Sequence, residues 1–249
     1  MDNFSNNDRE FAQFSNAGQT RAVAKDFVSN VLMLMSLGLM VSGALAYLTF
    51  NVDSLFYIMY NVDVDGNILG RTIAGWIVLL SPLGMVLGLR AGFNKFNAPT
   101  LTLLFVLFAA LMGMGLSSIF LMYKMPSIIL TFFISAGMFS VMAIAGYTTK
   151  TDLTKMGSLL FMGLIGIIIA SLVNMFLGSS QLDYIISFIG VLIFTGLTAY
   201  DMQKMKQIGM SVETGSEEAK KLAVTGALTL YLDFINLFLF LLRFFGNRD

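Results

Sequence analysis

The 249-residue chain contains no cysteine and no histidine. Without cysteine it has no disulfide framework, no thiolate nucleophile and no cysteine metal site. Without histidine the usual zinc and iron ligand sets cannot be assembled. We therefore expect neither a resident cofactor nor an enzyme active site.

Charge is also scarce, because only 12% of the residues are charged and fifteen basic residues balance fifteen acidic ones. This balance provides no basic surface for nucleic acid, so no nucleic-acid partner is expected. By contrast, 57% of the residues are apolar and the mean hydropathy is +0.79. Such a composition is typical of membrane proteins. The chain is predicted to be an all-α protein whose main partner is the lipid bilayer.

Seven apolar stretches are candidates for membrane-spanning helices, since each helix needs roughly 20 residues to cross a hydrocarbon core of about 30 Å. The second and sixth are short and are expected to borrow flanking residues. Residues 1–25 are predicted to form a polar cytoplasmic tail, without the apolar core of a cleavable signal peptide, and residues 26–249 a single seven-helix domain. The predicted spans are Phe27–Phe50, Thr72–Leu89, Ala98–Tyr123, Met125–Tyr147, Met156–Leu177, Tyr184–Tyr200 and Leu222–Leu242.

The distribution of Lys and Arg predicts the orientation, because cytoplasmic loops retain these residues. Eleven of the fifteen lie on the side of the N-terminus, which is therefore expected to be cytoplasmic. The C-terminus is expected outside if the last segment crosses fully, whereas a re-entrant segment would bring Arg243 and Arg248 inside. Because the C-terminus carries no retrieval signal, we expect a bacterial plasma (inner) membrane. The eleven residues are Arg9, Arg21, Lys25, Arg90, Lys95, Lys150, Lys155, Lys204, Lys206, Lys220 and Lys221.

The last predicted span, within "LTLYLDFINLFLFLLRFF" at 228–245, carries a carboxylate in an apolar run. If this helix begins near Leu222, Asp233 lies ~16 Å inside it, close to the bilayer midplane. An ionised carboxylate there costs at least ~2.5–3.5 kcal/mol, so Asp233 is expected to face protein or water. A helix facing lipid would not carry the polar stripe that this helix shows on one side. The stripe consists of Thr225, Thr229, Asp233 and Asn236.

Asp201, which follows the sixth apolar span, is the best partner for Asp233. If that helix continues to about Ile208, Asp201 lies ~10 Å inside its cytoplasmic end, at a depth comparable to that of Asp233. Helices adjacent in sequence tend to pack together. Two carboxyl groups in a low dielectric cannot both ionise cheaply, so they are expected to share a proton and titrate as a coupled pair. The alternative is that Asp201 only caps a helix end in interfacial water.

The stretches "FTGLTAYDMQKMKQI" and "LTLYLDFINLFLFLLRFFG" resemble the sixth and seventh helices of the Bax inhibitor-1 family, which includes the transmembrane Bax-inhibitor-motif proteins and many bacterial members. The resemblance implies a seven-helix fold whose central last helix is wrapped by helices one to three and four to six. It also implies a pH-sensitive calcium leak governed by an aspartyl pair, which falls on Asp201 and Asp233. The family's arginine that latches onto the sixth-helix aspartate best matches Arg90. Arg90 is alternatively a topology anchor that ends the second span.

These residues suggest a gate in which protonation of the aspartyl pair, and competition between Arg90 and Asp233 for Asp201, select a closed or an open helix arrangement. The resemblance implies calcium as the permeant ion, and calcium prefers oxygen ligands. A transient, low-affinity site is expected at Asp201 and Asp233, with Thr229 and Asn236 nearby and Thr225 as a further pore-lining residue.

Three other functions are compatible with two membrane aspartates. An intramembrane aspartyl protease is disfavoured because "LYL" precedes Asp233 where a glycine-x-glycine turn is required. A membrane interaction protein that regulates stress signalling or a membrane protease would make ion flux incidental. Proton-coupled transport of another solute is supported only by the acidic pair.

Two further features are interpreted as structural. The segment "NVDVDGNILGRT" at 61–72 resembles the first half of an EF-hand loop, but Thr72 stands where a bidentate glutamate is required, so a turn is predicted. Small residues four apart, such as Gly84 and Gly88, are expected to allow close approach of helices.

Overall fold

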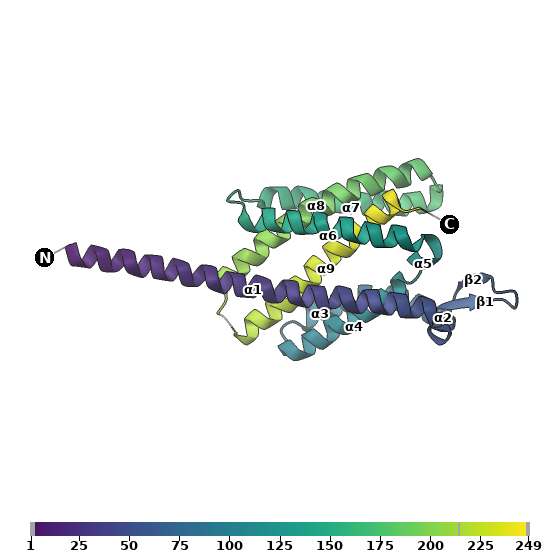
Figure 1. Ribbon diagram of the computed structural model, residues 1–249, viewed down its shortest axis with the longest axis horizontal. Helices are drawn as coiled ribbons and strands as arrows, with labels where there is room; N and C mark the ends of the chain where they lie inside the picture. The colour runs from purple at the N-terminus through teal and green to yellow at the C-terminus, as the bar shows by residue number, and fades with distance from the viewer. Residues whose placement is uncertain (1–2, 214, 248–249) are drawn as a thin grey trace.

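The computed structural model describes the backbone of residues 3–213 and 215–247, and the side chains of these residues from 22 onward. Most of the described chain is helical, and a short two-stranded sheet lies at one end (Figure 1). The elements are α1 (Asn3–Asn51), α2 (Asp53–Met59), β1 (Tyr60–Val62), β2 (Ile68–Arg71), α3 (Ile73–Gly92), α4 (Ala98–Leu116), α5 (Ile119–Met122), α6 (Met125–Thr148), α7 (Thr154–Leu177), α8 (Ser180–Ser211) and α9 (Glu217–Phe245).

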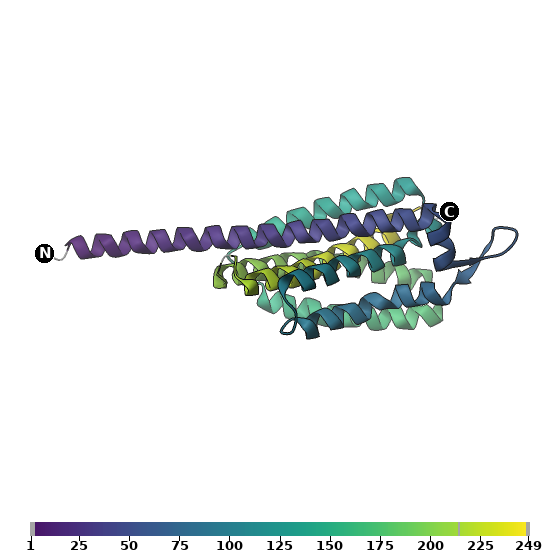
Figure 2. The ribbon, with the colours of Figure 1, turned by 90° about the horizontal axis from the view of Figure 1, so that it is seen from below.

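Seven segments of the described chain are long and apolar enough to cross a membrane, which confirms the predicted all-α, seven-span fold. The two short predicted spans gain flanking residues as expected, since α3 has 20 residues and α8 has 32. The chain is a multi-pass integral membrane protein. Its first helix extends well beyond the others at the N-terminal end, because α1 continues through residues 3–25, the segment predicted as a polar tail (Figures 1 and 2).

α9 is the central helix, as predicted. In Figure 1 it runs obliquely between a group formed by α6, α7 and α8 and a group formed by α1, α3 and α4. It packs directly against α1, α4, α6 and α8, whereas α3 packs on α4 and α7 packs on α8. In the most apolar 18-residue stretch of each helix, 67% of α9 is buried inside the protein, against 17% of α3 and 6% of α7. A polar residue on α9 is therefore shielded from lipid in a way that one on α3 or α7 is not.

The third predicted span agrees with one apolar segment at Ala98–Met122, although its helix is interrupted after Leu116. Ser117 and Ser118 lie between α4 and the short α5, and their hydroxyl groups donate to the carbonyls of Met114 and Gly115 at 2.7 and 3.3 Å. Serine side chains that bond to nearby carbonyls compete with the helical ladder and end it.

The predicted turn at 61–72 is the tip of a β-hairpin in which β1 pairs antiparallel with β2. Asp63 holds the tip by accepting from the side chain of Asn67 at 3.0 Å and from the backbone N–H groups of Asn67 and Asp65. These hydrogen bonds, led by the one from the Asn67 side chain, keep the pKa of the Asp63 carboxyl below its ordinary value. Gly66 supplies the positive φ that the turn requires.

The glycines predicted to allow close helix packing are not the ones that do so. Gly84 and Gly88 face open space, as expected of residues on the lipid side of α3. Instead, Gly113 of α4 lies against the backbone of α1, and Gly146 of α6 lies against the backbone of α8. Both contacts leave no room for a Cβ atom, so they fix how closely each helix group packs.

A buried hydrogen-bond chain joins α9 to α1 and α4. The Ser42 hydroxyl donates to the Ala109 carbonyl at 2.6 Å, so the Tyr231 hydroxyl must donate to Ser42 Oγ at 2.7 Å. The ring of Tyr231 is fully buried and meets Phe105 and Phe108 edge-on at centroid distances of 6.0 and 5.5 Å. This cluster anchors one face of the central helix.

We expect Gly146→Ala to lower the free energy of unfolding by about 1–3 kcal/mol, because the added methyl group collides with the Ala199 carbonyl. The control is Gly137→Ala on the same helix, where nothing lies within 4 Å and alanine is the better helix former. Denaturant titration in detergent micelles measures both. Equal stabilities of the two variants would show that α6 and α8 are not packed at this distance.

Candidate functional site

Two long helices place the aspartates at membrane depth. Asp201 lies on the buried face of α8, which continues ten residues further to Ser211, about 15 Å at 1.5 Å per residue. Asp233 lies on α9 sixteen residues after its start at Glu217, about 24 Å along the helix. Ser216 caps α9 by accepting from the N–H of Ala219 at 3.1 Å, so this helix begins at Glu217, five residues before the predicted start near Leu222.

The structure brings Asp201 and Asp233 together. Their side chains are hydrogen-bond partners, and the two residues are only 4% and 5% exposed. Two ionised carboxylates contain no donor, so a hydrogen bond between them requires a proton on one of them. The second carboxyl oxygen of Asp233, Oδ2, has no hydrogen-bond partner among the described residues. An unpartnered buried oxygen of this kind is available to a proton, a water molecule or a cation.

The aspartates open onto a cavity of about 570 Å³ between the two helix groups. Its walls come from α3, α7, α8 and α9, and most of the lining side chains are apolar. The polar side chains that line it include Arg90, Thr225, Thr229 and Asn236, so the fold gathers every predicted site residue around one cavity.

The polar stripe of α9 offers oxygen atoms to this cavity. Each of its three uncharged members donates to a carbonyl one turn earlier on the same helix, which uses the hydroxyl hydrogen of each threonine and one of the two amide hydrogens of Asn236. The remaining lone pairs are acceptors, which suit a cation better than an anion. The three bonds run from Thr225 to Lys221 at 3.2 Å, from Thr229 to Thr225 at 3.1 Å and from Asn236 to Leu232 at 2.7 Å.

Arg90 lies in the last turn of α3 and lines the same cavity, but the predicted latch is not formed in this structure. Arg243 forms an ion pair with Asp183 at 3.3 Å, whereas within the described part of the chain Arg90 forms an ion pair with neither Asp201 nor Asp233. Lys204, one turn beyond Asp201, is the cation whose charge acts on Asp201.

The described residues contain no group of three or more acidic side chains able to hold a metal ion. Asp201 and Asp233 supply two carboxyl groups, and Thr229 and Asn236 add neutral oxygens. Calcium takes six to eight oxygen ligands, so this set forms an incomplete shell suited to transient binding.

Sequence reasoning missed a polar clamp next to the aspartyl pair. Gln203, buried on α8, donates to the Thr151 carbonyl at 2.8 Å and accepts from the N–H of Leu153 at 2.9 Å. Because Leu153 is the N-cap residue of α7, Gln203 fixes the start of the helix that forms one wall of the cavity. The available signal was an uncharged polar residue on α8 between Asp201 and Lys204.

Lys206 folds back onto α6. Its Nζ donates to the Tyr147 carbonyl at 2.7 Å and lies 5.2 Å from the centre of the Tyr147 ring. The C-terminal part of α8 is thus tied to α6 as well as to α9.

A buried central helix, six surrounding helices and two carboxyl groups in contact define a polytopic α-helical membrane protein with an acidic centre. The chain belongs to the Bax inhibitor-1 family, because residues 24–249 match the family described as "Inhibitor of apoptosis-promoting Bax1". The match covers all seven membrane segments.

Relatives in several bacteria are similar over almost their whole length. Inner membrane protein YbhL of Escherichia coli is 43% identical over 231 residues, which cover 92% of this chain and 95% of the relative. A protein of Borreliella burgdorferi is 46% identical over 226 residues, which cover 91% of this chain and 94% of the relative. The protein RP147 of Rickettsia prowazekii is 43% identical over 89% of each chain.

We expect Gln203→Leu to lower the free energy of unfolding by about 1–3 kcal/mol, because the substitution removes both hydrogen bonds that join α8 to the Thr151 carbonyl and the Leu153 N–H. The matched control is Gln207→Leu, one turn further on α8, where the side chain is exposed. Thermal unfolding in detergent compares them. A control that loses as much stability as Gln203→Leu would contradict the clamp.

Proposed function

We propose that this protein is a pH-sensitive calcium leak channel in which Asp201 and Asp233 form the gate. The observation that supports it best is the contact between two buried carboxyl groups at the edge of a cavity whose other polar groups offer mainly oxygen. The proposed membrane is the bacterial inner membrane, with the N-terminus in the cytoplasm. The excess of Lys and Arg on that side and the name of the E. coli relative support this placement.

The gate works through the cost of placing two like charges side by side. Two carboxylates about 4 Å apart repel by ~4 kcal/mol at an effective dielectric constant of about 20. Each 1.4 kcal/mol changes an equilibrium tenfold, so removal of the shared proton shifts the balance between two helix arrangements by nearly three orders of magnitude. Repulsion is relieved if α8 and α9 separate, if Arg90 approaches Asp201, or if a cation enters.

Calcium is suited to relieve this repulsion by entering the site, because it is a doubly charged ion that prefers oxygen ligands. The aspartyl pair, Thr229 and Asn236 replace part of its hydration shell and leave the rest to water. Binding is then favourable enough for entry and weak enough for release, which conduction requires.

We expect Asp201→Asn and Asp233→Asn each to flatten the pH dependence of calcium flux into proteoliposomes, since asparagine keeps the volume of the side chain but does not titrate. Asp65→Asn, in the exposed hairpin, is the matched control and keeps the wild-type profile. Wild-type pH profiles in both gate variants would contradict the proposal. Absence of flux in the wild type, together with a stoichiometric membrane partner, would favour an interaction protein instead.

A second prediction concerns Arg90. A positive charge facing the cavity favours the ionised pair, so Arg90→Gln raises the proton occupancy at any given pH. The midpoint of the pH dependence of calcium flux is expected to move to higher pH, with a profile that remains steep. Lys95→Gln, in the loop after α3, removes the same charge outside the cavity and serves as control. An unchanged midpoint in Arg90→Gln would show that Arg90 is not part of the gate.

A further inference from the structure

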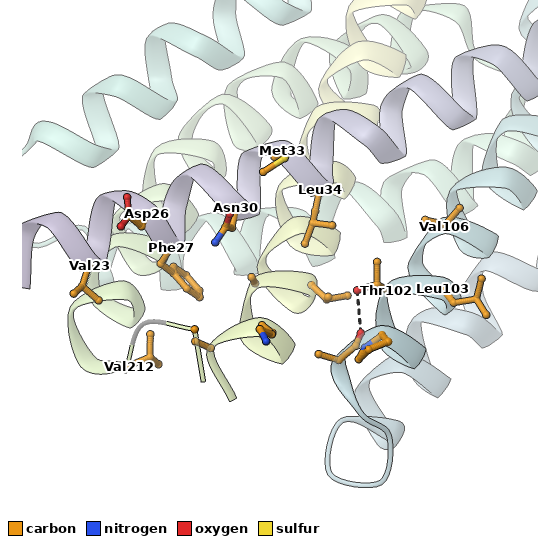
Figure 3. A pocket seen from close by; sticks show the side chains of 17 residues that line it. Val23, Asp26, Phe27, Asn30, Met33, Leu34, Thr102, Leu103, Val106 and Val212 are labelled. Atoms are coloured by element: carbon orange, nitrogen blue, oxygen red, sulfur yellow. Dashed lines mark hydrogen bonds between the residues drawn. The ribbon is translucent and has the colours of Figure 1, made fainter. Parts of the chain in front are cut away.

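A second, separate cavity of about 650 Å³ lies between α1, α4 and the first turns of α9 (Figure 3). Its walls are mainly aliphatic and aromatic, and Phe27, Leu34, Leu103 and Val106 are among its lining residues. None of the aspartyl-pair residues lines it. Cavities of this size with an apolar lining and a few polar groups are typical of sites for small amphiphilic ligands.

The length of this groove matches one leaflet of a bilayer. Along α1 its lining runs from Val23 to Leu34, which is eleven residues or about 16 Å. Half of a hydrocarbon core of about 30 Å is nearly the same length. Both α4 and α9 begin at one end of the groove, at Ala98 and Glu217. That end therefore lies at the level of lipid headgroups, and the rest lies at the level of acyl chains.

The headgroup end carries charges of both signs on opposite walls. Figure 3 shows Asp26 and Asn30 on the α1 side, one turn apart, and Lys220 lines the α9 side. Neither the Asp26 nor the Lys220 side chain makes a hydrogen bond or ion pair within the described chain, and all three residues are exposed. Charged and amide side chains without a partner at headgroup level suit a ligand that carries both an anionic and a cationic group.

A neighbouring cavity provides a comparison within the same molecule. It has about 500 Å³, lies between α1, α6 and α9, and is lined by residues such as Leu39, Phe132 and Phe238. No charged residue lines it. Apolar lining alone therefore does not distinguish the α1–α4–α9 groove, whereas the two opposite charges at its end do.

We propose that the α1–α4–α9 groove binds one membrane phospholipid whose headgroup joins a phosphate to a primary ammonium, as in phosphatidylethanolamine. The phosphate accepts from the Lys220 ammonium, and the lipid ammonium donates to the Asp26 carboxylate and the Asn30 amide oxygen. One acyl chain fills the apolar groove. A quaternary ammonium has no N–H to donate, so phosphatidylcholine is a weaker ligand. This site rests on the membrane-spanning fold and does not depend on the proposed leak.

The test is a native mass spectrometry titration of the full chain in detergent with phosphatidylethanolamine, phosphatidylcholine and phosphatidylglycerol that carry the same acyl chains. The wild type is expected to retain phosphatidylethanolamine about tenfold more tightly than either competitor. Asp26→Asn is expected to abolish the preference over phosphatidylglycerol, and Lys220→Gln to weaken binding of all three lipids. Both residues are on the surface, so these variants keep the fold.

A groove-filling variant separates this site from lipids bound elsewhere on the apolar surface. Val106→Trp occupies the groove and is expected to lose the retained lipid, whereas Leu107→Trp, the next residue on α4, lies outside it and keeps the lipid. Equal retention of the three lipids, unchanged binding in Val106→Trp, or equal loss in both tryptophan variants would overturn the proposal. A second protein copy or a peptide retained in place of lipid would overturn it as well.

Discussion

The contact between the carboxyl groups of Asp201 and Asp233 is the interaction on which the centre of this protein depends. Both side chains are nearly inaccessible, and they lie on two membrane-spanning helices, α8 and α9. A carboxylate isolated in hydrocarbon is costly, so each aspartate is tolerated because the other provides a hydrogen-bond partner. The contact holds α8 against α9, and it leaves a single carboxyl oxygen of Asp233 directed away from any partner in the described chain.

The two faces of α9 have different constraints. On one face Tyr231 is held by Ser42 and by the aromatic rings of α4, which joins the helix to α1 and α4. On another face the polar stripe and Asp233 line a cavity whose far walls, α3 and α7, belong to different helix groups. On the side of α7 and α8, the Gln203 clamp joins the two helices. The α1–α4–α9 groove lies at the start of the same central helix, on the anchored side.

The sequence was sufficient for features that depend on composition or on helical period. Span lengths follow from uncharged runs, and the stripe of Thr225, Thr229, Asp233 and Asn236 follows from a spacing of three to four residues. Features that depend on a tertiary partner were not predictable. Gly84 and Gly146 are equivalent in sequence terms, yet only Gly146 meets another backbone. At the helix break, the Ser117 hydroxyl forms a hydrogen bond at 3.0 Å with the hydroxyl of Tyr60, which lies 57 positions earlier in the chain. Gln203 likewise binds the N–H of Leu153, 50 positions earlier.

The most direct test of the central claim is infrared difference spectroscopy of the protein in bilayers with isotope-labelled aspartate. If Asp201 and Asp233 share one proton, the wild type shows the carbonyl band of a protonated, hydrogen-bonded carboxylic acid at neutral pH. This band disappears on alkaline titration, and it is altered or lost in Asp201→Asn and in Asp233→Asn but not in Asp65→Asn. Two fully ionised carboxylates at neutral pH, or a protonated band that neither substitution changes, would contradict the shared proton.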